Sequence, residues 1–244
     1  MSRSFALRGP RKGMIQRFEA PITQEEKLNV KKAILILLAS LMASGTVFAG
    51  GEKTYEVTVT NITAGQAFTP IIAATHRSSI SFFELGQAAS DELEMLAEGG
   101  NTMPLENLLN ANASVVSDVQ TTGDDLLGPG ESVTLYIEGK LRHDVLSIAA
   151  MLLPTHDTFV AVNSVPLPVG YSSTHAVAYD AGTEVNDESC ANIPGPYCMG
   201  APYSAEDGEG FVHVANGIQG IGDLAPEMFD WRNPVASVSI RRMK

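Results

Sequence analysis

Alternating and continuous runs of apolar residues predict a chain built mostly from short β-strands. Residues 55–61 alternate apolar and polar side chains with period two and are rich in β-branched residues, which is typical of a half-exposed strand. Residues 146–153 are almost uninterruptedly apolar, which indicates a buried strand. Pro70 lies in another apolar run and marks a strand start or a bulge. The remaining runs that predict strands are residues 67–75, 132–138, 159–162, 211–214 and 235–240.

A helical period occurs in one insertion after the second predicted strand. Ala89, Leu93 and Leu96 are spaced i, i+4 and i+7, and acidic residues cover the opposite face. Gly99 and Gly100 should end this helix, and a second short helix is expected over residues 105–109. Many short strands, turns rich in Gly and Pro, and helices confined to one insertion predict a mostly β protein, an antiparallel β-sandwich.

The first 49 residues are expected to be a leader rather than part of the fold. Two basic residues, Lys31 and Lys32, precede an uncharged and mostly apolar run over residues 33–49 that ends in Val-Phe-Ala, as a signal peptidase site requires. The alternative is a transmembrane anchor, but the run is short for a span and polar in its second half. We therefore expect a leader over residues 1–49, one exported domain over residues 50–244, periplasmic or secreted, and no membrane span after cleavage.

The charge of the expected mature part excludes some classes of partner. The leader holds 8 of the 16 Lys and Arg residues and 3 of the 28 acidic residues, which leaves 8 bases, 25 acids and a formal charge of −17. Such a surface repels nucleic acid and anionic membranes, because phosphate binding needs clustered basic side chains. It is instead compatible with cation binding.

The two cysteines, Cys190 and Cys198, are expected to form a disulfide. A close pair in an exported protein is normally oxidised, and the Pro-Gly-Pro segment between them lets the chain fold back. Closing so short a loop should add roughly 2–3 kcal/mol to the free energy of unfolding. The bridge would pin the aperiodic stretch over residues 187–210 as an ordered loop.

Two acidic segments stand out, one at residues 154–160 after the predicted buried strand and one at residues 179–184. Asp180 can accept hydrogen bonds from the amides that follow it and Gly182 tolerates a positive φ, so residues 179–184 are predicted to form a turn. Asp180 and Glu184 lie four residues apart across that turn and can point at one spot. Hard oxygen ligands converging from two loops suit a calcium ion. The acidic segment over residues 206–210 is either a solvated turn or a further source of ligands.

Five features in the same order resemble the spondin domain, the N-terminal module of the extracellular-matrix spondins and mindin, which also occurs in single-domain exported bacterial proteins. No single feature is specific, but their order is. They are the strand ending in Thr-His at residues 68–76, Gly86 with Ala89-Ser90, the helix end at residues 96–99, the strand and loop at residues 146–157, and Asp-Ala-Gly-Thr at residues 180–183. The resemblance covers residues 55–185 well and the final strand more weakly.

The resemblance implies a C2-like antiparallel β-sandwich with one Ca²⁺ held at one end by Asp157, Asp180 and Glu184. Two departures from the family pattern affect this expectation. Thr158 stands where the family has an aromatic residue, and Glu184 stands where it has Asp, although a longer Glu can still reach the ion. Asp187 and Glu188 lie close enough in the sequence to act as substitutes.

No combination of nucleophile, base and oxyanion site is recognisable in the sequence, so the protein is expected not to be an enzyme. His76 ends a buried-looking strand and is expected to make a structural hydrogen bond. The function predicted is that of an exported calcium-binding module with a binding or adhesion role towards an unknown protein, envelope or matrix partner. The alternatives are an exported hydrolase that uses the same carboxylates, which the single Trp231 disfavours, and a purely structural envelope protein.

Overall fold

The computed structural model describes residues 51–141, 144–204 and 208–244. The expected leader lies outside the described residues. The strands are β1 (Lys53–Asn61), β2 (Ala67–Phe68), β3 (Ile72–Arg77), β4 (Val116–Thr121), β5 (Ser132–Gly139), β6 (Asp144–Leu153), β7 (Thr158–Pro166), β8 (Tyr171–Asp180), β9 (His213–Val214) and β10 (Ala236–Arg242). The helices are α2 (Asp91–Gly99), α3 (Met103–Ala111), the short α4 (Pro226–Phe229) and the 3₁₀ turn η1 (Cys190–Asn192).

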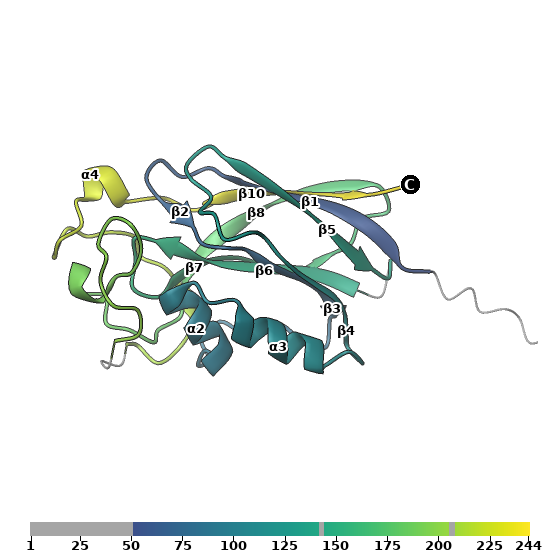
Figure 1. The fold of residues 1–244 in the computed structure, drawn as a ribbon, viewed down its shortest axis with the longest axis horizontal. Helices are drawn as coiled ribbons and strands as arrows, with labels where there is room; N and C mark the ends of the chain where they lie inside the picture. The colour runs from purple at the N-terminus through teal and green to yellow at the C-terminus, as the bar shows by residue number, and fades with distance from the viewer. Residues whose placement is uncertain (1–50, 142–143, 205–207) are drawn as a thin grey trace, which may run out of the picture. The chain divides into compact units, whose positions relative to one another are not determined.

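The described strands form one antiparallel sheet that folds over into two layers. Its order is β4-β3-β6-β7-β8-β10-β1-β5, with β2 paired to β6 and β9 paired to β8. Figure 1 shows β1, β5, β8 and β10 above, β3, β4, β6 and β7 below, and helices α2 and α3 beneath the lower layer. The layers join where the end of β7 nearest Thr158 pairs with the end of β8 nearest Asp180.

The two outer edges of the sheet also approach each other, which gives it a nearly barrel-like closure. The backbone amide of Glu138 in β5 donates to Asp118 Oδ2 in β4 at 2.8 Å. The prediction of a mostly β, antiparallel fold with two inserted helices is confirmed. The finer expectation of a C2-like sandwich stays a prediction, because the observed strands are joined in one continuous path.

Strand β6 is buried on both faces, which explains its uninterrupted apolar sequence. One face, including Leu146, Ile148 and Leu152, packs in the core between the layers with residues of β1 and β10. The other face belongs to a second core, in which Ala149 packs with Leu93 and Leu96 of helix α2. Burial on both faces removes the polar alternation that a half-exposed strand would show.

Helix α2 begins after Ser90 and ends at the glycines that the sequence predicts. The Ser90 side chain accepts a hydrogen bond from the Leu93 amide, and Gly100 adopts a left-handed conformation with φ +66°. The predicted strand over residues 67–75 is divided into β2 and β3. Thr69 lies at the division, where its hydroxyl accepts a hydrogen bond from the Met151 amide at 3.0 Å.

Strands β4 and β8 were not predicted. Strand β8 contains Ser, Thr and His and buries few large apolar residues, so its sequence lacks a strong strand signal. Its pairing with β7, β9 and β10 holds it in place. Within the described ranges, no helix is long and apolar enough to cross a bilayer.

Candidate metal centre

The turn after β8 has the conformation that its sequence predicts. Asp180 Oδ1 accepts a hydrogen bond from the Gly182 amide at 2.8 Å, and Gly182 has φ +69°. A Cβ at Gly182 would lie 2.4 Å from the backbone oxygen of Phe211, so only glycine fits here. The turn therefore holds Asp180 at its start and Glu184 at its end.

Asp157 lies in the loop between β6 and β7 and is held by the backbone of this turn. Its Oδ2 accepts hydrogen bonds from the amides of Thr183, at 2.7 Å, and Glu184, at 3.1 Å. The residue is fully buried, and its second oxygen, Oδ1, has no hydrogen-bond partner. Two loops that are distant in the sequence thus bring Asp157 against the turn.

Glu184 is also fully buried, and only one of its two carboxylate oxygens accepts a hydrogen bond. Its Oε1 accepts a hydrogen bond from the Ser204 amide at 2.5 Å. Its Oε2 has no hydrogen-bond partner, and His156 Nδ1 lies 3.7 Å from it. A buried carboxylate oxygen without a partner carries a large desolvation cost.

The electrostatics of this region disfavour negative charge. The pKa of Asp157 is raised to about 7, chiefly by burial and also by the nearby charges of Asp180 and Glu184, while the two turn amides lower it. Burial also raises the pKa of Asp180, while the neighbouring His213 opposes the shift. The carboxyl groups are therefore close enough to repel one another when all are ionised.

Glu98 is a further buried acid that sequence reasoning did not select. Helix α2 delivers it to the turn with 2% of its surface exposed. Its pKa is raised to about 7, chiefly by burial and also by the charge of Glu184, while a hydrogen bond with the Thr183 side chain lowers it. The sequence does hold one signal for Glu98. This residue follows the apolar residues Leu96 and Ala97 near the C-terminal end of the helix, where the helix dipole disfavours a negative charge.

Asp180 also belongs to a second group of potential ligands. Single atoms of Asp180, Glu209 and His213 all lie within 4.8 Å of one another, so this cluster could hold a metal ion. His213 Nε2 lies 3.5 Å from Asp180 Oδ1 and 3.7 Å from Glu209 Oε2. The sequence flagged the segment of Glu209 as a possible source of ligands but gave no reason to join it to His213. Whether Asp157, Asp180 and Glu184 bind one ion stays a prediction.

A cavity of about 430 Å³ opens beside this cluster. Polar and acidic residues, including His156, Asp180 and Glu209, line one part of it, and Trp231 and Leu224 contribute apolar surface. The single tryptophan of the chain therefore lies in the same cavity as the acidic residues. The position of Trp231 in the sequence, shortly before β10, did not indicate that the side chain would lie in a cavity with these acidic residues.

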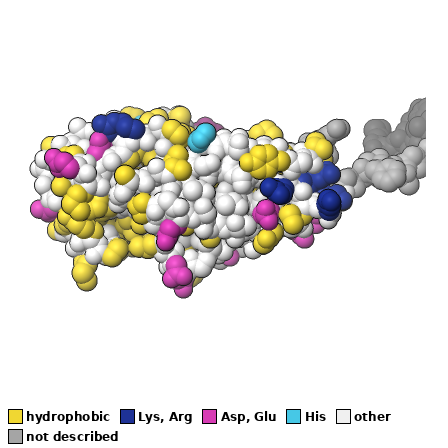
Figure 2. All heavy atoms as spheres, turned by 90° about the horizontal axis from the view of Figure 1, so that it is seen from above, with side chains coloured by type: hydrophobic (Ala, Val, Ile, Leu, Met, Phe, Trp, Pro, Cys, Tyr) yellow, Lys and Arg dark blue, Asp and Glu magenta, His cyan; other side chains and the backbone are white. Residues whose placement is uncertain are grey.

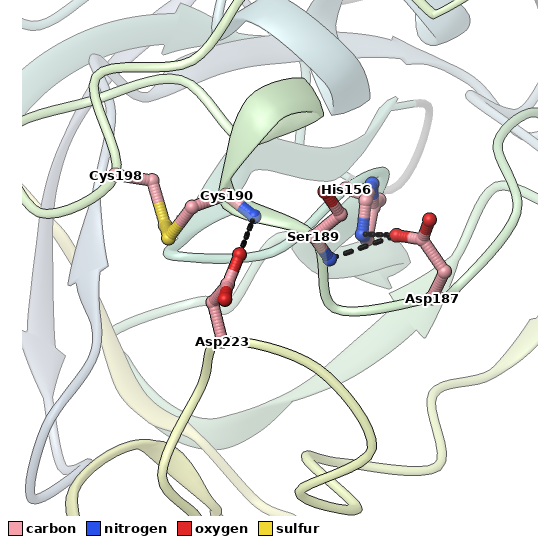
Figure 3. Close-up of a disulfide and its surroundings, with 6 residues drawn as sticks. All are labelled: His156, Asp187, Ser189, Cys190, Cys198 and Asp223. Atoms are coloured by element: carbon pink, nitrogen blue, oxygen red, sulfur yellow. Dashed lines mark hydrogen bonds and ion pairs between the residues drawn. A yellow bond between two sulfur atoms is a disulfide. The ribbon is translucent and has the colours of Figure 1, made fainter.

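Asp187 and Glu188 both make hydrogen bonds to loop backbone, and their role as substitute ligands stays a prediction. Glu188 is buried, and its two oxygens accept hydrogen bonds from the amides of Gln219, at 2.5 Å, and Ile221, at 2.9 Å. Figure 3 shows Asp187 accepting a hydrogen bond from the Ser189 amide, with its Oδ1 3.1 Å from His156 Nε2.

The disulfide between Cys190 and Cys198 is present, as predicted, with a Cα–Cα distance of 4.8 Å. Figure 3 shows that Asp223 from a separate loop accepts a hydrogen bond from the Cys190 amide, at 2.9 Å. The bridge is consistent with export to an oxidising compartment. His76 has the predicted structural role, because its ring nitrogens lie 2.9 Å from the Arg77 carbonyl and 2.8 Å from the Ser147 hydroxyl.

Comparison with known proteins identifies the family of the chain. No curated protein matches the chain. Residues 53–188, more than half of the 244 residues, match the family model described as Spondin_N. The matched range includes the strands from β1 to β8, the two inserted helices, and the turn that contains Asp180 and Glu184. The chain therefore belongs to the spondin N-terminal domain family.

Proposed function

We propose that this domain is an exported calcium-binding module that recognises a partner in the cell envelope or matrix and does not catalyse a reaction. The observation that carries the proposal is a pair of orphaned carboxylate oxygens. Asp157 Oδ1 and Glu184 Oε2 belong to fully buried residues and have no hydrogen-bond partner. Such oxygens are costly without a partner, and a bound cation would supply one.

The donor set fits calcium better than other common metals. Asp157, Asp180 and Glu184 offer only carboxylate oxygens, which are hard ligands suited to Ca²⁺. The ion would supply positive charge among acids whose burial, together with their mutual repulsion, raises the pKa of Asp157 to about 7. Glu98, which lies near Glu184 and Asp157, adds negative charge to the same region.

The exposed surface at the loop end supports a role in binding. Large apolar side chains that are at least 40% exposed include Tyr197, Met199, Tyr203, Phe211, Ile221 and Met228, all from the part of the chain between β8 and β10. Figure 2 shows hydrophobic side chains gathered at the end of the molecule away from most of the basic ones on that face. Exposed apolar groups of this kind are typical of surfaces that bind other proteins.

The proposal is tested by measuring calcium binding to the purified domain directly. Isothermal titration with Ca²⁺ should give one site in the 10⁻⁴–10⁻³ M range that is common for extracellular modules, and Mg²⁺ should bind much more weakly. Asp157→Asn should abolish calcium binding, because it removes one of the orphaned oxygens. Asp223→Asn is the matched control, since it lowers the negative charge equally but lies beside the disulfide. Equal calcium affinity in wild type and Asp157→Asn would disprove the site.

A hydrolase is the second candidate, favoured by Trp231 lining the same cavity as Asp180 and Glu209. Glycosidases combine two carboxyl groups across a cleft, and the indole would provide an apolar platform for a sugar ring. Activity of the wild type on generic glycoside or ester substrates, lost in Glu209→Gln, would support this candidate. Absence of turnover together with calcium binding favours the binding module.

A further inference from the structure

His213 and Asp180 face each other across a short antiparallel pair at the cavity. Strand β9 pairs with the end of β8 so that His213 lies opposite Asp180. Directly opposed residues on neighbouring strands project from the same face of a sheet. Glu209 lies four residues before His213 and approaches the same imidazole nitrogen. Three ligand-bearing side chains thus meet at one end of β8.

The tautomer of His213 is fixed by the backbone. Its Nδ1 lies 3.0 Å from the Val214 carbonyl oxygen, which can only accept, so Nδ1 carries the proton and donates. This leaves Nε2 directed at Asp180 and Glu209. Metal-ligating histidines are commonly oriented in this way. One ring nitrogen donates its proton to a backbone carbonyl, and the other nitrogen is left to bind the metal.

The separations in this cluster fit a shared ion better than direct hydrogen bonds. The Nε2 atom is buried and makes no hydrogen bond, and it lies 3.5 Å from Asp180 and 3.7 Å from Glu209. Charge-assisted hydrogen bonds are shorter, at about 2.7–2.9 Å. Ligands bound at about 2.0–2.2 Å in a tetrahedral zinc site lie about 3.3–3.6 Å apart, which is close to the observed spacing.

A second buried imidazole faces the same cavity. His156 is 3% exposed and lines the cavity together with Asp180 and Glu209. Neither of its ring nitrogens makes a hydrogen bond, although Nε2 lies 3.1 Å from Asp187 Oδ1. Its Nδ1 lies 3.7 Å from Glu184 Oε2. An almost fully buried imidazole without a hydrogen bond, in the cavity that Asp180 and Glu209 line, is an independent sign that the cavity receives a polar or cationic ligand.

We propose that Asp180, Glu209 and His213 form a second metal site, specific for a divalent ion of the zinc type. An imidazole ligand favours zinc and other borderline transition metals over calcium, which takes oxygen ligands. Three protein ligands leave coordination positions open towards the cavity, as in zinc sites that bind an exchangeable fourth ligand. The site shares Asp180 with the proposed calcium site but otherwise uses different residues.

The test uses the metal-stripped domain with Zn²⁺ in isothermal titration and Co²⁺ as a spectroscopic probe. Co²⁺ should give the intense visible bands of a four- or five-coordinate ion with a nitrogen ligand. His213→Ala and Glu209→Gln should each weaken Zn²⁺ binding by at least about 10–100-fold, the cost of losing even an outer-shell partner. His175→Ala, an exposed histidine on β8, is the matched control and should bind like the wild type.

Calcium binding separates this proposal from the first one. Glu209→Gln should keep calcium binding and lose Zn²⁺ binding, whereas Asp157→Asn should do the reverse. Glu209 is largely exposed, with 41% of its side chain accessible, so its substitution should leave the fold intact even if His213→Ala does not fold. The second site is overturned if Glu209→Gln binds Zn²⁺ as tightly as the wild type, or if the wild type gives a six-coordinate Co²⁺ spectrum. Either result holds whatever the outcome for calcium.

Discussion

Calcium-free protein should lose stability as the pH rises, in contrast to ordinary acid denaturation. The pKa of Asp157 is about 7 in the folded protein against an ordinary value of 3.8. Between these two values the folded state therefore holds a proton that the unfolded state has released. Stability falls with rising pH wherever the folded state binds more protons, so the contribution is complete below about pH 4 and lost above about pH 7.

The size of the effect follows from the difference between the two pKa values. Each pH unit over which the folded state holds one extra proton lowers the free energy of unfolding by about 1.4 kcal/mol. Asp157 alone should therefore lower it by about 3 kcal/mol between about pH 5 and about pH 8. A domain of this size shifts by about 2–4 °C per kcal/mol, which gives a fall of about 6–12 °C in melting temperature. Glu98, whose pKa is also raised to about 7 by burial, acts in the same direction. Bound calcium should remove most of the fall, because it stabilises the ionised carboxylates.

The assay is a series of thermal melts from about pH 5 to about pH 8, in EDTA and in millimolar calcium. In EDTA the wild type and the control Asp223→Asn should both show the downward slope, and Asp157→Asn should show a much smaller one. Calcium should flatten the slope for the wild type and the control while leaving Asp157→Asn unchanged. A wild-type melting temperature in EDTA that stays level or rises over this range refutes the reasoning about the buried carboxylates.

Three further predictions concern the turn, the disulfide and Glu98. Gly182→Ala should lower the free energy of unfolding in urea by at least about 1 kcal/mol, because Gly182 has a φ of +69° and an added Cβ would clash with Phe211. Gly170→Ala is the control and should have little effect, because the space around its Cβ is open. Replacing Cys190 and Cys198 together by Ser should lower the free energy of unfolding by roughly 2–3 kcal/mol, and a reductant should then destabilise only the wild type. Glu98→Gln should raise the melting temperature in EDTA at about pH 8 by removing a buried negative charge, and an equal or lower value would contradict the repulsion inferred from its raised pKa.

Local sequence patterns determined the features that depend on neighbours along the chain. The apolar run of β6, the cap and stop of α2 at Ser90 and Gly100, and the turn from Asp180 to Glu184 all follow from short-range sterics, hydrogen bonding and periodicity. The Cys190–Cys198 bridge belongs to the same class, because its partners are eight residues apart. Among them, the β6 strand, the end of α2 and the acidic turn also carry the resemblance to the spondin domain.

Tertiary structure decided which chemical groups meet. The sequence separates Asp180 from His213 and Glu209 by a long loop, and only the pairing of β9 with β8 brings them together. Helix α2 places Glu98 against the turn, and the chain before β10 places Trp231 in the same cavity as Asp180. No local pattern encodes such contacts, because they depend on the folding of one continuous sheet into two layers. The acidic turn and Asp157 could therefore be selected from the sequence, but the approach of Glu98 and His213 to that turn could not.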